Sequence, residues 1–307
     1  MNIVFMGTPD FAVPCLEKLA QSEHTVLAVF CQPDRPKNRG HKLMPSPVKE
    51  CAEKYAIPVY QPETLKDGEA FELLKKINPD CIVVAAYGRI LPPEIIHLPR
   101  LGCVNLHASI LPKYRGAAPI QQAILNGDSE TGVTVMQMGE GLDTGDILVC
   151  EKIDITCGYT AGELFDKLSI LAAEMIVPAI ESLDKGEIVP VKQDDSKATY
   201  AKMMSKEMSP IDWNKSAFEI RNQILGLNPW PSATMTLPNG EIMKIYRAKI
   251  IENACAKSGE VANNSKEFII GCGDGKGLIL EEVQLSGGKR MSGADFLRGK
   301  GKAIFGL

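Results

Sequence analysis

Strand-like apolar runs alternate with amphipathic helical segments through residues 1–186, and this alternation constrains the fold more than any other feature of the chain. The apolar run at 1–7 ends in a glycine and is followed by a helical pattern at 11–22 and a second apolar run at 24–32. Two parallel strands need a crossover segment between them, and that segment is usually a helix. Repeated strand–helix units therefore predict an α/β domain with a largely parallel sheet.

The same alternation predicts five more strands and four more helices before residue 187. The strands are expected at 58–62, 80–88, 101–109, 131–138 and 146–155. The helices are expected at 47–56, 67–78, 118–127 and 160–186. Thr160 is followed three residues later by Glu163, which fits a capping box at the start of the longest helix.

The character of the sequence changes after this long helix. Residues 189–206 are polar and without periodicity, which predicts a linker between a first domain at 1–188 and a second domain at 207–307. The second domain opens with a short helical pattern and continues as alternating strands, with turn signals such as Asn239-Gly240 between them. About five short strands in roughly 90 residues predict a small β-barrel, and the OB type fits that number.

The composition is that of a globular protein without a membrane segment. Hydrophobic residues make up 45% and charged residues 23% of the chain, and no apolar run reaches the roughly 18 residues of a membrane span. The N-terminal segment has neither a basic start nor a cleavage site, so we expect a first strand there and a cytoplasmic protein. The nine cysteines include no CxxC pair and no Cys/His cluster at zinc-ligand spacing, which predicts buried free thiols and no metal site.

Three polar residues of complementary chemistry stand out in the first domain. Asn105 and His107 lie two residues apart at the end of an expected strand, so both side chains point to one face. Asp143 lies in the loop GLDTGD, where Asp146 competes for the same role and spacing does not separate the two. An imidazole relays protons, a carboxylate orients it, and an amide stabilises an oxyanion. The set suits transfer of an acyl group to an amine without a covalent enzyme intermediate.

A dinucleotide site is not indicated. The turn after the first strand is GTPDF, and a glycine turn before a helix suits phosphate. The second and third glycines of a GxGxxG fingerprint are missing, however. Gly7 instead predicts a tight strand-to-helix turn at the carboxyl edge of the sheet, where α/β proteins place their ligands.

Positive charge is concentrated in two places, although the formal net charge of the chain is −4. Residues 206–307 carry 14 Lys and Arg against 11 Asp and Glu, and the final stretch at 287–307 carries five cations against one anion. A second cluster lies at 31–49, where Asp34 is the one acidic residue and five residues are basic: Arg35, Lys37, Arg39, Lys42 and Lys49. One such cluster is usually a solvated surface, but two that flank a candidate site favour a polyanionic partner.

The segments NLHASILPKYRGAAP at 105–119 and GLDTGD at 141–146 resemble those of the folate-dependent formyltransferases. GTPDFA, QPDRP, KLMPSPVK, AYGRILP and NPWPSA follow the same family in order, and they resemble the branch that formylates methionine on initiator tRNA. The resemblance is densest over residues 1–150. It implies a Rossmann-like formyltransferase domain with a C-terminal OB-like β-barrel domain. It also implies 10-formyltetrahydrofolate as donor, initiator Met-tRNA as acceptor, a role in translation initiation, and no metal or redox cofactor.

The resemblance further implies roles for individual residues. Asn105, His107 and Asp143 take the catalytic positions of the family; Asp143 either orients His107 and balances its charge or relays a proton through water to the leaving N10, and the sequence leaves both roles open. The implied folate-binding residues are Arg89, Ile90, Leu91, Ser109, Ile110, Leu111 and Pro112. The implied tRNA-binding residues are Lys37, Arg39, Lys42, Lys289, Arg290 and Arg298.

Other interpretations stay open on the sequence alone. Glycinamide ribonucleotide formyltransferases share the three catalytic residues but need only the first domain. The three catalytic residues alone do not distinguish a formyltransferase that acts on an amino-sugar nucleotide from one that acts on methionyl-tRNA. From a different class, a tRNA-binding protein with a vestigial active site is disfavoured by the intact set. Trp230 either stacks on a base or packs in a core, with packing favoured, and we expect a monomer.

Overall fold

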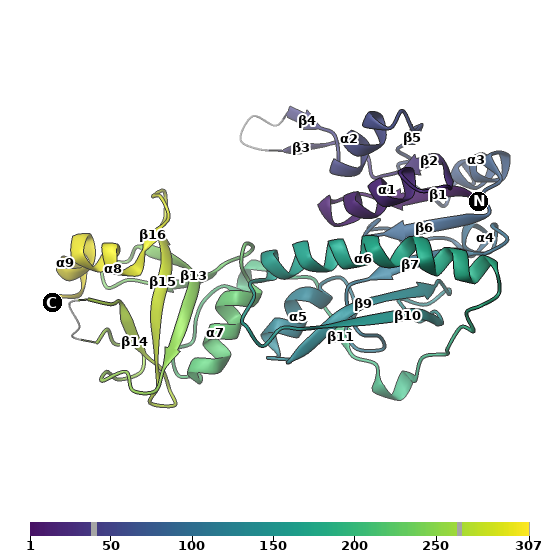
Figure 1. Cartoon of the computed structure of the whole chain (residues 1–307). Coiled ribbons are helices and arrows are strands. Elements are labelled where there is room, and N and C mark those ends of the chain that lie inside the picture. The colour runs from purple at the N-terminus through teal and green to yellow at the C-terminus, as the bar shows by residue number, and fades with distance from the viewer. Residues whose placement is uncertain (38–41, 263–265, 307) are drawn as a thin grey trace. The chain divides into compact units, whose positions relative to one another are not determined.

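The computed structural model describes residues 1–37, 42–262 and 266–306 of the chain (Figure 1). The chain divides into two compact units. The first comprises Met1–Gly116, Thr131–Ile153 and Phe165–Ala201, and the second comprises Ala117–Glu130, Asp154–Leu164 and Lys202–Leu307. Each unit is therefore assembled from segments that are not contiguous in the sequence.

Within the described residues, a seven-stranded mixed sheet forms the centre of the first unit, in the order β10-β9-β7-β6-β1-β2-β5. Its strands are β1 (Asn2–Gly7), β2 (Thr25–Phe30), β5 (Val59–Tyr60), β6 (Cys81–Ala85), β7 (Cys103–His107), β9 (Glu130–Gln137) and β10 (Ile147–Asp154). The strands from β7 to β5 pair in parallel, whereas β9 runs antiparallel to β7. The predicted α/β domain with its largely parallel sheet is confirmed.

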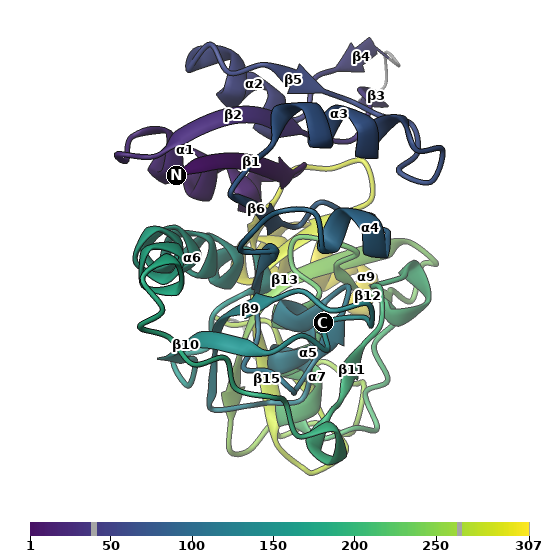
Figure 2. The same cartoon turned by 90° about the vertical axis from the view of Figure 1, so that its right-hand side faces the viewer.

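Helices cover both faces of this sheet. Figure 2 shows α1 (Val13–Ala20) and α6 (Ala161–Asp184) on one side, and α3 (Glu69–Ile77) and α4 (Pro93–Ile96) on the other. Val4 and Met6 of β1 pack in one hydrophobic cluster with residues of α3 and α4. All residues from 3 to 6 have 0% exposure, so the strand is buried on both faces, as is typical of parallel sheets.

A short antiparallel hairpin occupies the basic insertion after β2. Its strands are β3 (Arg35–Lys37) and β4 (Lys42–Met44), and helix α2 (Pro47–Lys54) follows. Strands of three residues contain too few positions for a periodic pattern, so the sequence does not predict them. Ser46 caps α2, because its hydroxyl accepts a hydrogen bond from the Lys49 amide at 3.2 Å.

An antiparallel sheet forms the core of the second unit, in the order β12-β13-β15-β14, with β16 paired to β15. The strands are β12 (Ala233–Thr236), β13 (Ile242–Ile251), β14 (Ile269–Gly271), β15 (Gly277–Leu285) and β16 (Met291–Ser292). The short helices α8 (Gly293–Phe296), η4 (Leu297–Gly301) and α9 (Lys302–Phe305) follow. The path of this sheet has two ends, so no closed barrel is found within the described residues, and the OB-like barrel stays a prediction.

Helix α7 (Ala217–Gly226) packs on α5 (Pro119–Leu125) within the second unit. A Cβ atom at Gly226 would lie 2.9 Å from Cγ of Leu125, so the glycine permits this close approach. The sequence predicts residues 118–127 as part of the first domain, whereas α5 belongs to the second compact unit. The domain boundaries at 188 and 206 stay a prediction.

The segment 187–201, most of it predicted as a linker, runs along the first unit. Val191 forms an antiparallel bridge with Ile147. Strand β11 (Tyr200–Ala201) pairs in parallel with β8 (Arg115–Gly116), eight residues beyond the end of β7. This part of the chain is therefore hydrogen-bonded to the loop that follows His107.

The prediction that the cysteines are buried free thiols is confirmed for six of them and wrong for Cys150, Cys157 and Cys255. Six of the nine cysteines are buried, among them Cys81 and Cys103 of the central strands, and the other three are exposed. Burial raises the pKa of the Cys81 thiol to about 12. In the part of the chain that the structure describes, no helix combines the length and apolar character of a membrane span. The same residues contain no group of three or more His, Cys, Asp or Glu arranged to hold a metal ion.

Candidate active site

His107 is the last residue of β7, and Asn105 lies two residues before it, at the carboxyl end of the parallel strands. The strand alternates Val104 and Leu106 with these two polar residues, so Asn105 and His107 turn to the same face. Asn105 is 9% exposed and His107 is 6% exposed. The two predicted side chains thus share a site that is largely shielded from water.

Both ring nitrogens of His107 face oxygen atoms. Nε2 lies 2.9 Å from the Tyr114 carbonyl oxygen, which can only accept, so Nε2 carries a proton in this contact. Nδ1 lies 3.6 Å from Oδ2 of Asp143. A ring that carried a proton on both nitrogens would have an oxygen atom on each side, and the Asp143 carboxylate would offset its positive charge.

Asp143 is the carboxylate that accompanies His107. Its Oδ2 accepts a hydrogen bond from the Gly116 amide at 2.7 Å. Its backbone is left-handed, with φ +51°, a conformation that Asp adopts more readily than most residues. The competing Asp146 follows at the end of the loop, where its carbonyl accepts from the Gln137 amide. Within the described residues, the ion pair of His107 is with Asp143 and not with Asp146.

The side-chain amide of Asn105 has no hydrogen-bond partner among the described residues. Its carbonyl and amino groups are therefore available to a bound molecule. An amide donor at this position, next to the imidazole, can hydrogen-bond to an oxygen that becomes negatively charged during a reaction. The catalytic role of Asn105 stays a prediction.

Thr134 of β9 holds the loop that follows His107, with which it pairs across the two strands. Its hydroxyl donates to the Ser109 carbonyl at 2.6 Å and accepts from the Leu111 amide at 3.1 Å. The Ser109 hydroxyl in turn donates to the Lys113 carbonyl at 2.7 Å. Thr134 was not predicted as a site residue, because its strand pattern shows only that it is buried.

The predicted folate-binding residues differ widely in exposure. Leu91 is 3% exposed and packs in the core of the first unit, whereas Ile90 is 78% exposed. Arg89 donates a hydrogen bond to a backbone carbonyl of an earlier loop. Ser109 and Leu111 are buried. Their exposure alone therefore does not define a common binding surface, and the folate-binding assignment stays a prediction. The remaining two residues, Ile110 and Pro112, are partly exposed.

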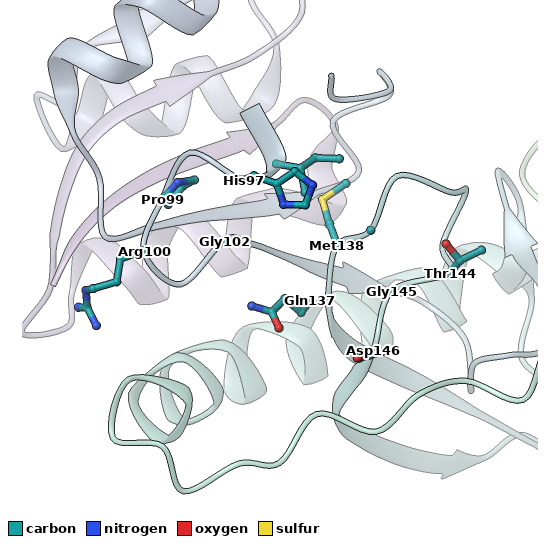
Figure 3. Close-up of a pocket in the computed structure, with 11 residues that line it drawn as sticks. His97, Pro99, Arg100, Gly102, Gln137, Met138, Thr144, Gly145 and Asp146 are labelled. Atoms are coloured by element: carbon teal, nitrogen blue, oxygen red, sulfur yellow. The ribbon is translucent and has the colours of Figure 1, made fainter. Parts of the chain in front are cut away.

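A hollow of about 520 Å³ opens on the first unit, and Figure 3 shows the residues that line it. The walls come from the segments 96–102 and 137–146. They include Asp146 but none of the three candidate catalytic residues and none of the predicted folate-binding residues. Arg100 in the wall is paired with Asp80 and Asp184. The hollow is thus a surface apart from the catalytic side chains.

The tRNA contacts predicted for the first unit fall on the β3–β4 hairpin. Lys37 and Lys42 are paired residues of its two strands, and Arg39 lies outside the described residues. Lys49, at the base of the hairpin, donates a hydrogen bond from Nζ to Oδ2 of Asp34 at 2.7 Å. The charge of Lys49 is therefore partnered within the protein.

The cations predicted for the second unit lie near its last strands and helices. The guanidinium carbon of Arg290 lies 3.5 Å from the centre of the Tyr246 ring, a cation–π contact. Arg298 pairs with Asp295. Lys289 is exposed. Two of the three predicted cations thus already have partners within the second unit.

Trp230 differs from its expected environment. Core packing was favoured for this residue, but it is 53% exposed. About half of the indole surface is therefore accessible, which is the condition for stacking on a base.

Two buried polar side chains behind the Asp143 loop were not predicted. Arg115 is 2% exposed and Gln193 is 6% exposed. Burial alone would lower the pKa of Arg115, but hydrogen bonds to Asp195 and Tyr200 outweigh that effect and raise it. Gln193 lies in a polar stretch whose composition gives no sign of burial. Only the packing of that stretch in the first unit shows that Gln193 is buried.

Comparison with known proteins identifies the family to which the chain is similar. Residues 1–180 match the formyl transferase family model, and residues 203–301 match the model for the formyl transferase C-terminal domain. The mixed sheet, the buried Asn105 and His107 and the second matched segment thus define the class of protein as a formyl transferase with both of these domains.

The relatives specify the group within that class. A methionyl-tRNA formyltransferase of Clostridium novyi is 51% identical over 302 residues, which cover 97% of this chain and 97% of the relative. Another of Lachnospira eligens is 49% identical over 306 residues, or 97% and 96% of the two chains. An N-formyltransferase of Helicobacter canadensis, solved with folinic acid and dTDP-3-aminofucose, shares the fold with a TM-score of 0.69 at 21% identity, over 91% of this chain and 98% of that chain. The chain therefore belongs to the methionyl-tRNA formyltransferase family.

Proposed function

We propose that this chain transfers the formyl group of 10-formyltetrahydrofolate to the α-amino group of methionine esterified to initiator tRNA. The product is N-formylmethionyl-tRNA, which serves translation initiation. One observation carries the choice of acceptor: identity of 51% to a methionyl-tRNA formyltransferase extends over 97% of the chain and includes both matched domains. An enzyme of the glycinamide ribonucleotide type needs only the first domain and leaves the second without a role.

The donor follows from the family and from the position of the site. Formyl-tetrahydrofolate is the formyl source of this family, and the Helicobacter canadensis relative of the same fold was solved with folinic acid. We infer that the folate lies against residues 89–91 and 109–112, at the carboxyl end of the parallel strands. Ile90 offers an exposed apolar side chain there. A folate that carries its own activated formyl group needs no metal for the transfer.

The proposed transfer involves two bond changes. The neutral amine attacks the formyl carbon, which forms the new C–N bond and converts the carbonyl oxygen to an oxyanion. The bond from carbon to N10 then breaks, the amine loses a proton and N10 gains one. We assign Asn105 to donate a hydrogen bond to the oxyanion. We assign His107 to stabilise the same oxygen and move the proton, for which Nε2 must exchange the Tyr114 carbonyl for the substrate.

The position of Asp143 supports one of its two possible roles. Its Oδ2 lies 3.6 Å from Nδ1 of His107 and accepts from the Gly116 amide. A carboxylate held in this way can orient the imidazole and balance its charge. The contacts favour this role over a relay of the proton to N10.

The tRNA partner is assigned to two basic regions, one in each unit. Lys37 and Lys42 of the hairpin, and Arg39 between them in the sequence, would meet phosphates near the acceptor end, as would Lys289, Arg290 and Arg298 in the second unit. An OB-like arrangement of the second sheet would provide a surface of the kind that binds nucleic acids. We further propose that the enzyme acts as a monomer in the cytoplasm, where aminoacylated tRNA is used.

A sugar-nucleotide acceptor is the second candidate, because the Helicobacter canadensis relative was solved with dTDP-3-aminofucose. That likeness is one of fold at 21% identity, whereas relatives at 49% and 51% identity are methionyl-tRNA formyltransferases. The tRNA acceptor is therefore preferred.

Direct transfer tests the proposal. The full chain is given donor labelled in the formyl group together with methionyl initiator tRNA, and the label is expected on methionine after hydrolysis of the ester. Asn105→Ala should lower kcat about a hundredfold, because a donor to the oxyanion is lost. Folded wild-type protein that leaves methionine unlabelled would rule the proposal out.

A further inference from the structure

Gln193 lies behind the loop that carries Asp143. Its Nε2 donates to the Asp143 carbonyl at 2.8 Å and to the Gly145 carbonyl at 2.7 Å. Its Oε1 accepts from Nε of Arg115 at 3.1 Å and from Nη2 of the same residue at 2.8 Å. A carboxamide has two N–H donors and two acceptor lone pairs, so this side chain uses all four at a position that is 6% exposed.

The partners of Gln193 fix the orientation of its amide. Backbone carbonyls only accept and a guanidinium only donates, so a flipped amide would oppose like groups at every contact. The orientation that the structure shows is the one in which each partner is satisfied. Such a fully satisfied buried network holds its members in one geometry.

Arg115 links the contacts of Gln193 to those of the Asp143 carboxylate. The residue after Arg115 is Gly116, whose amide donates to Oδ2 of Asp143 at 2.7 Å. Asp143 is therefore held by two hydrogen bonds: its side chain accepts one from Gly116, and its backbone carbonyl accepts one from Gln193. Arg115 connects these two hydrogen bonds, because its side chain contacts Gln193 and its main chain continues into Gly116.

The loop itself supplies little rigidity at this point. Gly141 and Gly145 flank Asp143, and glycine has more conformational freedom to lose than any other residue. The left-handed backbone of Asp143, with φ +51°, is also uncommon for a residue with a side chain. Contacts from outside the loop are needed to keep the carboxylate in one place.

We propose that Gln193 is a positioning residue for formyl transfer, which holds the main chain of Asp143 so that its carboxylate stays beside Nδ1 of His107. This inference rests on the proposed function, because it takes Asp143 to support the transfer. It gives the segment 187–201 a role in the site: this segment delivers a side chain to the back of the catalytic loop.

Gln193→Glu is the sharpest single test. It keeps the size of the side chain and an acceptor for Arg115, but it sets a carboxylate oxygen against two backbone carbonyls. We expect kcat to fall about 10- to 100-fold, since small displacements of a catalytic group have effects of that order. KM for the donor and for methionyl-tRNA should change less than about threefold. Gln193→Met, which carries no charge, should lower kcat similarly and serves if the first variant does not fold.

Asp194→Asn is the matched control in the same segment. Asp194 accepts hydrogen bonds from Ser196 and pairs with Lys197, and among the described residues none of its hydrogen bonds or ion pairs goes to the loop that carries Asp143. Asparagine can make the same cap, so kcat should stay within about twofold of wild type. A loss in this variant equal to that of Gln193→Glu would overturn the inference, because any change in the segment would then have the same effect.

A double-mutant cycle shows whether Gln193 acts through Asp143. If it does, Asp143→Asn combined with Gln193→Glu is no slower than Asp143→Asn alone. Losses that multiply would contradict the inference. So would a lowered thermal midpoint with unchanged kcat per folded, folate-binding molecule, the result expected of a merely structural role.

The cycle also separates this inference from the proposed function. A slow Asp143→Asn with a normal Gln193→Glu rejects the role of Gln193 alone. Wild-type rates in Asp143→Asn reject the catalytic assignment on which the inference rests.

Discussion

His107 has an oxygen atom near each of its ring nitrogens, and the sequence predicts only part of this arrangement. Alternation along one strand was enough to place Asn105 and His107 on the same face, and the structure agrees. The choice between Asp143 and Asp146 was not available from spacing. Both lie in one short loop, and the backbone conformation of that loop determines which carboxylate turns toward the imidazole.

Replacing His107 tests its role most simply. His107→Ala should lower kcat roughly a hundredfold or more without unfolding the protein, because the proton-transfer and oxyanion partner is lost. Steady-state transfer to methionyl-tRNA measures the effect. His97→Ala is the control, since that imidazole is 66% exposed and lies outside the site. Near-wild-type turnover of His107→Ala would remove His107 from the mechanism.

Gly145 is the second residue whose replacement is informative. A Cβ atom there would lie 1.8 Å from the Gln137 carbonyl oxygen, so Gly145→Ala must displace the loop that carries Asp143. We expect kcat to fall tenfold or more, in line with the roughly hundredfold cost of about 1 Å of misplacement. At Gly139 the nearest atom to such a Cβ is 3.8 Å away, so Gly139→Ala should cost much less. Equal rates for the two variants would show that the loop geometry is not critical.

At the scale of elements, the hairpin β3–β4 was expected only as a basic insertion. Lys49, Asp34 and Gln61 connect its two ends: Nζ of Lys49 donates to Asp34 at 2.7 Å and to Gln61 at 2.9 Å, and Gln61 donates to Asp34 at 2.7 Å. Composition cannot show such a network, because a lysine in a basic run looks like any other surface cation. The long strands and helices were predictable because their apolar patterns repeat over many residues.

Loosening the base of the hairpin should weaken tRNA binding and leave the chemistry intact. Lys49→Met removes two hydrogen bonds of a charged group, and we expect KM for methionyl-tRNA to rise about three- to tenfold. KM for the folate donor should not change. Lys54→Met, one turn later in α2, removes the same charge without the network. If both variants raise KM equally, net charge and not the network is responsible.

The network also predicts how this effect depends on pH. Hydrogen bonds from Lys49 and Gln61 lower the pKa of Asp34. The contribution of Asp34 to the stability of the hairpin base is therefore present above its ordinary pKa of 3.8, and it is lost only as pH falls through the lowered pKa. The hydrogen bond to Asp34 raises the pKa of Lys49. The contribution of Lys49 to the stability of the hairpin base is therefore lost only as pH rises beyond the ordinary lysine pKa of 10.5. The ratio of KM between Lys49→Met and wild type should therefore be constant between about pH 6 and 9. A ratio that changes across this range would contradict the assignment.

At the scale of the whole molecule, the sequence indicated two domains but not how they share the chain. Helix α5 has an apolar face that suits either unit, and only its packing on α7 assigns it to the second. The segment 187–201 is polar, as linkers are, yet it carries Gln193 into the first unit. Both features depend on contacts between residues that are far apart in the sequence, and local patterns do not record such contacts.

Limited proteolysis tests this view of the segment. Val191 and Ile147 exchange two backbone hydrogen bonds, at 2.8 and 2.9 Å, and the Thr199 carbonyl accepts from the Arg115 amide at 2.8 Å. Among the lysines of the predicted linker, trypsin should cut after Lys202, at the boundary between the units, before it cuts after Lys192. Mass spectrometry of the first fragments shows the order. Early cleavage after Lys192 would mean that the segment is a free linker.

A competition assay tests the central claim most directly. The full chain is supplied with 10-formyltetrahydrofolate and offered methionyl initiator tRNA and glycinamide ribonucleotide together, with His107→Ala run in parallel. We predict formyl-methionyl-tRNA as the product, no formylated nucleotide, and a rate about a hundredfold lower in the variant. Formylation of the nucleotide, or of neither acceptor, would contradict the assigned function and leave the basic hairpin and the second unit without the role proposed for them.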